Sequence, residues 1–233
     1  MALVVLQPHG LGDHIFCMSL VYQIADRQEI IWPVLEHFIP GLRFAYPEIN
    51  WIPTGLLGLQ IENHKRIGQV NGHTIAPIRW ADQLTRKPYK DCMRSKYDLY
   101  GLDWKTWKDF DYKRDLMKEK RLFNQVLGLR ENEPYRLINR RFTSLETKSV
   151  AITHSKEIRN IEMQSFEGFS LFDWSMVIAK AAEIHTVGTS INYIIEMLPI
   201  QAKEVVLYKR RPDENHFENY DYILKRHKYV FMD

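Results

Sequence analysis

The start of the chain constrains the fold more than any other stretch. The apolar run Val4–Leu6 is followed at once by a loop with two glycines, Gly10 and Gly12, and then by the mixed apolar segment 15–25. This order predicts a buried strand, a glycine-rich turn and a helix. In an open α/β sheet, such a unit builds a ligand crevice, because strand carboxyl ends and helix N-termini meet there.

The acid of this loop, Asp13, has two interpretations that the residues leave open. Gly10 and Gly12 allow a ligand to approach the backbone, and Asp13 is placed where a general base is aimed into a crevice. The alternative is a tight turn in which Asp13 caps the helix. His9 and His14 flank this acid and are candidates for contacting an acceptor.

The rest of the chain alternates between strand and helix patterns, which predicts parallel sheets with right-handed crossovers. Pattern and turn signals favour strands at 30–34, 49–53, 70–77, 135–139, 149–154, 183–187 and 205–208, and a closing helix or extended tail at 220–228. A helical stretch, 104–127, ends before Gly128, and the linker-like segment 131–134 follows it. We therefore predict two α/β halves, residues 1–130 and 131–233.

The second chemical motif follows the predicted strand 183–187, where Gly188, Thr189 and Ser190 open a helix. Free N–H groups at a helix start attract phosphate oxygens, so the motif is a candidate diphosphate site. An ordinary Ser or Thr helix cap is the alternative. Taken together, the two glycine-containing motifs predict two strand–loop–helix edges that face each other across a cleft.

Composition excludes several classes. The 233 residues carry a formal net charge of +3 and are 45% apolar, which is typical of a folded protein and does not demand a nucleic-acid partner. Cys17 and Cys92 are the two cysteines, too few and too isolated for a disulfide framework or a CxxC zinc site. We expect no signal peptide, no membrane span and a cytoplasmic location.

Two stretches, Pro8–Ile15 and Ile178–Ile191, resemble the GT-B glycosyltransferases of the heptosyltransferase-like kind, which include small phage and bacterial relatives. The resemblance implies a compact α/β protein with two Rossmann-like halves, the first on the acceptor side and the second binding a nucleotide-sugar. It also implies a hexosyl- or heptosyl-type transferase that needs no metal and no cofactor beyond its nucleotide-sugar co-substrate. Inversion at the transferred carbon follows from the same likeness.

The resemblance assigns roles to residues. Asp13 becomes the general base, and the donor or its diphosphate is bound by Gly10, Gly12 and the Gly188–Thr189–Ser190 motif. Basic side chains near strand ends of the second half are further candidates for binding the donor. A basic and an aromatic residue of the first half are candidates for binding the acceptor. These are Arg140, Arg141, His154, Arg159 and His185 for the donor, and Arg79 and Trp80 for the acceptor.

The acceptor is predicted to be a glycan or a hydroxylated nucleobase in DNA. The alternative function is a non-catalytic nucleotide- or DNA-binding accessory protein, in which Asp13 is only a helix cap. For the basic side chains, a solvated surface position is the competing interpretation, and for a lone histidine it is a structural role. The chain also departs from the family where a helix histidine is common, because Asn192 occupies that place.

Overall fold

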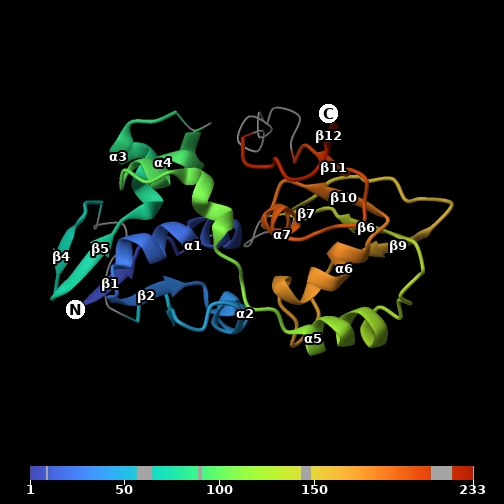
Figure 1. Cartoon of the computed structure of the whole chain (residues 1–233), viewed down its shortest axis with the longest axis horizontal. Helices are drawn as coiled ribbons and strands as arrows, with labels where there is room; N and C mark the ends of the chain where they lie inside the picture. The colour runs from blue at the N-terminus through green and yellow to red at the C-terminus, as the bar shows by residue number, and fades with distance from the viewer. Residues whose placement is uncertain (9, 57–64, 89–90, 143–147, 211–221, 233) are drawn as a thin grey trace. The chain divides into compact units, whose positions relative to one another are not determined.

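The structure is a computed structural model that describes residues 1–8, 10–56, 65–88, 91–142, 148–210 and 222–232. Contacts divide the chain into two compact units, Met1–Lys113 and Arg114–Asp233 (Figure 1). The division falls within the stretch 104–127, which we predicted as the helical end of the first half. Helix α5, Leu116–Arg121, packs against α6, Ser175–Lys180, and therefore belongs to the second unit.

The first unit is built on a five-stranded sheet of order β3-β2-β1-β5-β4. Strands β1, β2, β3 and β5 are parallel, whereas β4 runs antiparallel to β5. Its elements are β1 (Ala2–Val5), α1 (Leu11–Ala25), β2 (Glu29–Val34), η1 (Glu36–Phe38), α2 (Ile39–Ala45), β3 (Asn50–Pro53), β4 (Gly68–Val70), β5 (His73–Ala76), η3 (Ile78–Trp80), α3 (Ala81–Thr85), α4 (Cys92–Asp98) and η5 (Trp104–Asp109).

Strand β1 occupies the centre of this sheet because all four of its residues are apolar and buried, as expected for a parallel strand covered on both faces. Val4 and Leu6 pack with Ile31 and Ile75 of the neighbouring strands. The single segment predicted over 70–77 is a hairpin, β4–β5, whose turn residues Asn71 and Gly72 both have positive φ, as a two-residue type I′ turn requires.

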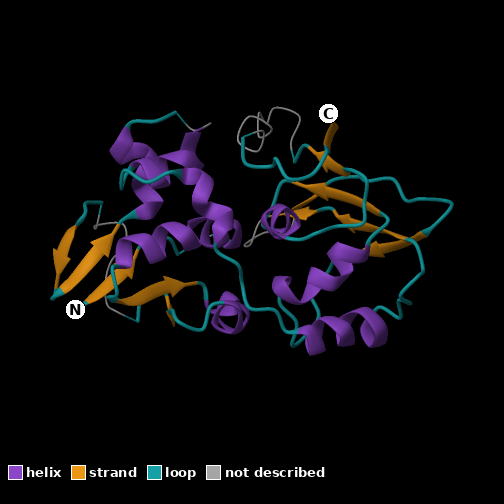
Figure 2. Ribbon diagram, in the orientation of Figure 1, coloured by secondary structure: helices purple, strands orange, loops and turns teal. Residues whose placement is uncertain are grey.

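The second unit contains a five-stranded, all-parallel sheet of order β12-β11-β10-β6-β9 (Figure 2). Its elements are α5, the π-helical turn η6 (Leu122–Val126), β6 (Tyr135–Asn139), β7 (Arg141–Phe142), β8 (Lys148–Ser149), β9 (Arg159–Glu162), η7 (Leu171–Trp174), α6, β10 (Glu183–Val187), α7 (Ile191–Met197), β11 (Val205–Tyr208) and β12 (Tyr229–Met232).

One strand prediction in this unit was wrong, and the predicted end of the chain contains an additional strand. The segment predicted as a strand at 149–154 is irregular after β8, because its carbonyls at Ile152 and Thr153 accept hydrogen bonds from arginine side chains rather than from a neighbouring strand. Strand β6 pairs with β10 and with β9, and β9 begins ten residues later than the predicted strand. At the C-terminus, the described part of the predicted helix or tail, 222–228, is not helical and leads into β12, an additional strand.

Candidate functional site

The candidate site of the first unit lies where the strand order of its sheet reverses. From β1, the chain adds β2 and β3 on one side and then crosses to β5 on the other. The loops after β1 and β5 therefore leave the same edge of the sheet, and the backbone N–H of Arg79 donates to the carbonyl of Leu6 at 2.9 Å. Ligands of open α/β sheets bind at such a switch point. Asp13, Arg79 and Trp80 therefore lie at the same edge of the first sheet.

Gly10 shapes the first loop, whereas Gly12 does not. Gly10 precedes α1 with a φ of 80° and a ψ of 93°, a conformation that residues with a side chain rarely adopt. A Cβ atom at this position would lie 2.3 Å from Oδ2 of Asp13, so the carboxylate occupies space that only glycine leaves open. Gly12 lies within the first turn of α1, contrary to the expectation that it belongs to the loop.

The Asp13 carboxylate is paired with a buried lysine that the sequence analysis did not identify. Its Oδ1 lies 3.1 Å from Nζ of Lys96, which comes from α4. The Lys96 side chain is 7% exposed and that of Asp13 is 32% exposed. Lys96 also donates to Oε1 of Gln7 at 3.1 Å, and the Gln7 carbonyl accepts from the Trp32 indole. The ion pair is the interaction that we observe for this carboxylate, rather than a cap on the backbone of α1.

The environment of Lys96 keeps its ammonium group charged. Burial is the largest single influence and by itself lowers the pKa of Lys96, but the Asp13 carboxylate, the nearby thiols of Cys17 and Cys92, and the hydrogen bond to Asp13 together raise the pKa above its ordinary value. A signal in the sequence could have found this residue. Lys96 lies beside the buried Met93 and Tyr97 of a short helix, and a lysine on an apolar helix face needs an anionic partner.

His14, predicted to contact the acceptor, is instead fully buried. Its ring packs against Trp32, Phe38 and Trp51 at centroid distances of 5.3, 6.0 and 6.2 Å. Burial lowers the pKa of His14 to about 4, against the opposing influence of the Asp13 charge and of the nearby backbone. A direct contact with an acceptor is therefore incompatible with this position. The other histidine of the loop, His9, lies outside the described residues.

Arg79 and Trp80 form a cationic and aromatic cluster at the same sheet edge. Nζ of Lys65 lies 4.5 Å from the centre of the Trp80 ring, and the guanidinium carbon of Arg79 lies 5.1 Å from it. The Trp80 indole nitrogen is buried and has no hydrogen-bond partner within the described part of the chain. Flat rings flanked by cations suit sugars and bases, so the cluster is consistent with an acceptor-binding surface.

The second sheet has its own switch point, between β6 and β10. From β6 the chain adds β9 on one side and then crosses to β10 on the other, so the loops after β6 and β10 leave the same edge. The Asn139 amide at the end of β6 donates to the hydroxyls of Thr186 and Thr189, both at 3.0 Å. This contact joins the end of β6 to the Gly188–Thr189–Ser190 motif.

The geometry of this motif differs from the prediction in one respect. The backbone N–H of Thr189 donates to Oδ1 of Asn192 at 2.9 Å, so this amide is used within the protein and not left free. Asn192 is fully buried, and its amide nitrogen has no partner in the described ranges. Ser190 is the residue before α7, and its side chain makes no capping bond. The Asn192 side chain thus fixes the backbone of the loop that precedes α7.

Arg140 follows β6 directly and belongs to a charged cluster at the same edge. Its guanidinium lies 2.5 Å from Oε1 of Glu162, at the end of β9, and 3.0 Å from Nε2 of His154. His154 is in turn 2.7 Å from the same carboxylate oxygen. Two of the predicted donor-binding residues, Arg140 and His154, are therefore brought together. Arg141 is exposed, in β7, one residue beyond.

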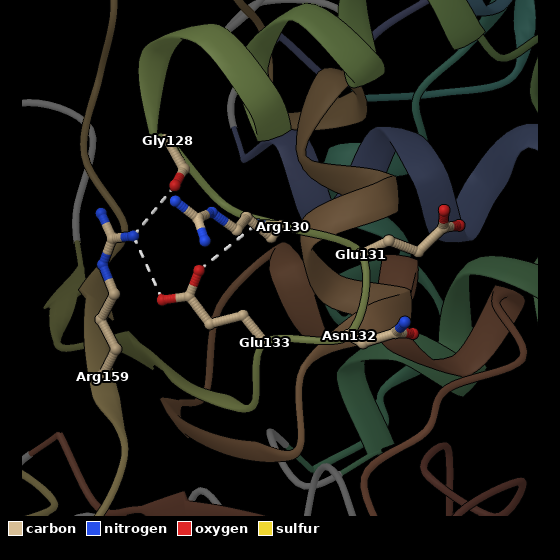
Figure 3. A pocket seen from close by; sticks show the side chains of 6 residues that line it. All are labelled: Gly128, Arg130, Glu131, Asn132, Glu133 and Arg159. Atoms are coloured by element: carbon tan, nitrogen blue, oxygen red, sulfur yellow. Dashed lines mark hydrogen bonds and ion pairs between the residues drawn. The ribbon is translucent and has the colours of Figure 1, made fainter.

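Arg159 was predicted near this cluster, but it lies at the opposite edge. It is the first residue of β9 and pairs with Tyr135, the first residue of β6. Figure 3 shows its guanidinium directed toward Gly128 and Glu133, with distances of 3.1 Å to the Gly128 carbonyl and 3.4 Å to Oε1 of Glu133. The prediction failed because it placed Arg159 in the loop after a strand at 149–154, whereas Arg159 begins strand β9.

These groups line an open polar hollow of about 660 Å³ in the second unit, formed by Gly128, Arg130, Glu131, Asn132, Glu133 and Arg159 (Figure 3). The hollow lies at the amino ends of the strands, and two of its charged side chains, Arg159 and Glu133, already pair with each other. Because the chemistry of open α/β sheets gathers at the carboxyl ends, we assign it no catalytic role.

His185 was likewise expected at a strand end, but it is the middle residue of β10 and half-buried on a face of the sheet. Its Nδ1 lies 2.9 Å from the Tyr208 hydroxyl. Burial, and then the charge of Arg136, lower the pKa of His185. These contacts are those of a structural histidine rather than of a group aimed at a ligand.

The described residues contain no group of three or more His, Cys, Asp or Glu side chains that could hold a metal ion. None of the helices in the described ranges combines the length and the apolar character needed to span a bilayer.

Comparison with known proteins identifies the fold. No family model matches the sequence, and no curated protein matches it. Among solved structures, the chain is similar to a glycosyl transferase family 9 protein from Veillonella parvula DSM 2008, with a TM-score of 0.56 and 10% sequence identity. The match covers 99% of this chain and 85% of that one. The likeness establishes the fold. The predicted α/β class with two Rossmann-like halves is confirmed.

Proposed function

We propose that this chain is a glycosyltransferase that moves a hexosyl or heptosyl group from a nucleotide-sugar to an acceptor hydroxyl. The observation that carries the proposal is the position of Asp13. It is a partly exposed carboxylate at the switch point of the first sheet, held by a buried lysine. The fold shared with a glycosyl transferase family 9 protein supports the same reaction class.

In the proposed mechanism, Asp13 accepts the proton of the acceptor hydroxyl while that oxygen attacks the anomeric carbon of the donor. The bond from this carbon to the diphosphate breaks at the same time, and its electron pair leaves with the nucleoside diphosphate. A single displacement of this kind inverts the configuration of the anomeric carbon. One base is sufficient, because the leaving diphosphate needs no proton from the protein.

The second unit would bind the donor. Arg140 and the loop joined to Asn139 through Thr189 lie at the switch point of its sheet, where open α/β sheets bind nucleotides. Arg140 would offset the charge on the leaving diphosphate, in place of a metal ion. Its pairing with Glu162 means that donor binding must compete with an internal carboxylate. Arg141, next to it and exposed, is a second candidate for the diphosphate.

The first unit would bind the acceptor through the cluster of Arg79, Trp80 and Lys65. A glycan hydroxyl or a hydroxylated nucleobase of DNA has the required chemistry, and the ring faces suit either. A cytoplasmic location and a phage or bacterial origin remain predictions of the sequence alone.

A screen of nucleoside diphosphates and their sugars by thermal shift tests donor binding. A ligand at 100 times its dissociation constant adds about 2.7 kcal/mol of apparent stability. Donors that stabilise the protein are then incubated with it and with glycans or with DNA that carries hydroxylated bases, and the released nucleoside diphosphate is measured. Binding without release under all these conditions favours the non-catalytic accessory protein. DNA binding with a steep salt dependence and no affinity for nucleoside diphosphates also contradicts the proposal.

A further inference from the structure

Lys96 is a buried charged residue of the first unit to which the proposed mechanism gives no role. It is almost fully buried on α4, and its ammonium group contacts two residues of the loop that follows β1, Gln7 and Asp13. Burying an ammonium group is expensive unless it is paired and hydrogen-bonded, and both conditions are met here. The lysine therefore ties α4 to the loop that carries the proposed base.

The contacts distinguish the two oxygens of the Asp13 carboxylate. Oδ1 receives the ion pair from Lys96 at 3.1 Å. Oδ2 is directed over Gly10, where a Cβ atom would lie 2.3 Å away, and it has no hydrogen-bond partner among the residues that the structure describes. One oxygen is thus held by a buried ammonium group, and the other belongs to a side chain that is one-third exposed.

We propose that Lys96 is a positioning residue, which fixes Oδ1 of Asp13 so that Oδ2 is the oxygen that takes the acceptor proton. The inference rests on the proposed function. In the step concerned, the acceptor O–H proton passes to Oδ2, the acceptor oxygen bonds to the anomeric carbon, and the diphosphate leaves with the electron pair of the broken bond. Lys96 transfers no proton. Its raised pKa agrees with this, because it stays an ammonium group throughout.

The alternative is an ion pair that serves stability only. In that case Lys96→Met would lower stability, because it leaves the Asp13 carboxylate without its partner, but the folded variant would keep its turnover. A positioning role predicts instead that turnover falls while donor affinity is kept. A misplacement of about 1 Å in a reacting group can cost about 100-fold in rate.

The test is a double-mutant cycle with Lys96→Met, Asp13→Asn and the double variant, measured as nucleoside diphosphate release from a donor found by the thermal-shift screen. Lys96→Met should lower kcat about 100-fold with donor affinity unchanged. In the Asp13→Asn background, the same substitution should change kcat less than about 3-fold, because it acts through the residue already lost. Lys96→Arg keeps a cation and should retain more turnover than Lys96→Met.

Lys87→Met is the matched control. Lys87 belongs to the same unit and pairs with Asp98 at 3.8 Å, but both side chains are well exposed. Its substitution should leave kcat unchanged. Thermal melting of every variant separates loss of turnover from loss of folding, and Lys96→Arg provides a second variant if Lys96→Met does not fold.

The outcomes separate the two proposals. No turnover by the unaltered protein with any donor, or full turnover by Asp13→Asn, counts against the glycosyltransferase function itself. Turnover that depends on Asp13 but is unaffected by Lys96→Met overturns the role of Lys96 alone. Equal and additive losses in both backgrounds also overturn it, because Lys96 would then act independently of Asp13.

Discussion

The buried His14 makes the first unit sensitive to mild acid. In the folded chain its pKa is about 4, whereas the value in an unfolded chain is 6.5. The unfolded state therefore binds this proton more readily, so the stabilising contribution of the neutral ring is complete above pH 6.5 and is lost as the pH falls toward 4. The pKa difference corresponds to about 3 kcal/mol of unfolding free energy.

His14→Leu tests this linkage. Leucine cannot be protonated and suits an apolar site beside Trp32 and Trp51, so the variant should lose much less unfolding free energy than the unaltered protein between pH 7.5 and pH 4.5. Denaturant unfolding followed by tryptophan fluorescence reports on the first unit, because five of the six tryptophans lie within Met1–Lys113. His37→Leu, at a residue that is not buried, is the control. Equal acid sensitivity of His14→Leu and the unaltered protein would refute the reasoning.

Three further substitutions test other contacts. Gly10→Ala should cost about 1–2 kcal/mol of unfolding free energy because Gly10 has a positive φ, and it should also lower turnover. Gly55→Ala is the control. Gly55 also has a positive φ, but no atom lies within 4 Å of the added Cβ, so this substitution should lower stability alone. Glu196→Ala should cost about 3 kcal/mol in denaturant unfolding and reduce hydrogen-exchange protection of β12, because this buried carboxylate accepts the backbone N–H groups of Lys225 and Arg226. Asn139→Ala should weaken donor binding about 10-fold by calorimetry, whereas Asn132→Ala, at the opposite edge, should not.

Periodicity predicted those parts of the fold that local sequence determines. The central strand β1 is a run of buried apolar residues, a signal that acts within a few residues of the chain. The strand β9 was missed because four residues with a single buried position, Ile161, carry little pattern. The segment before it contained a better apolar run, but its carbonyls are used by arginine side chains.

For the candidate site too, the sequence predicted the residues that a local pattern places and missed those that packing places. Arg140 follows a strand directly, and Asp13 lies in the first turn of the helix that follows one, so the predicted strands placed both at a sheet edge. Lys96 was missed because its partner is 83 positions away in the sequence, and such pairing is set by packing rather than by local pattern. His14 and Arg159 were misplaced because residue type and proximity to a motif do not reveal which way a side chain points.

The central claim is that Asp13 is the general base, and the kinetic effect of Asp13→Asn tests it most directly. The substitution keeps the size of the side chain, so donor affinity by calorimetry should stay within about 3-fold, while kcat should fall by about 10²–10⁴-fold. Because Asp13→Asn also removes the charge that pairs with Lys96, the melting temperature of the variant is measured to show that it is folded. A folded Asp13→Asn variant with unchanged kcat, or one that loses donor binding and turnover in equal proportion, would contradict the account.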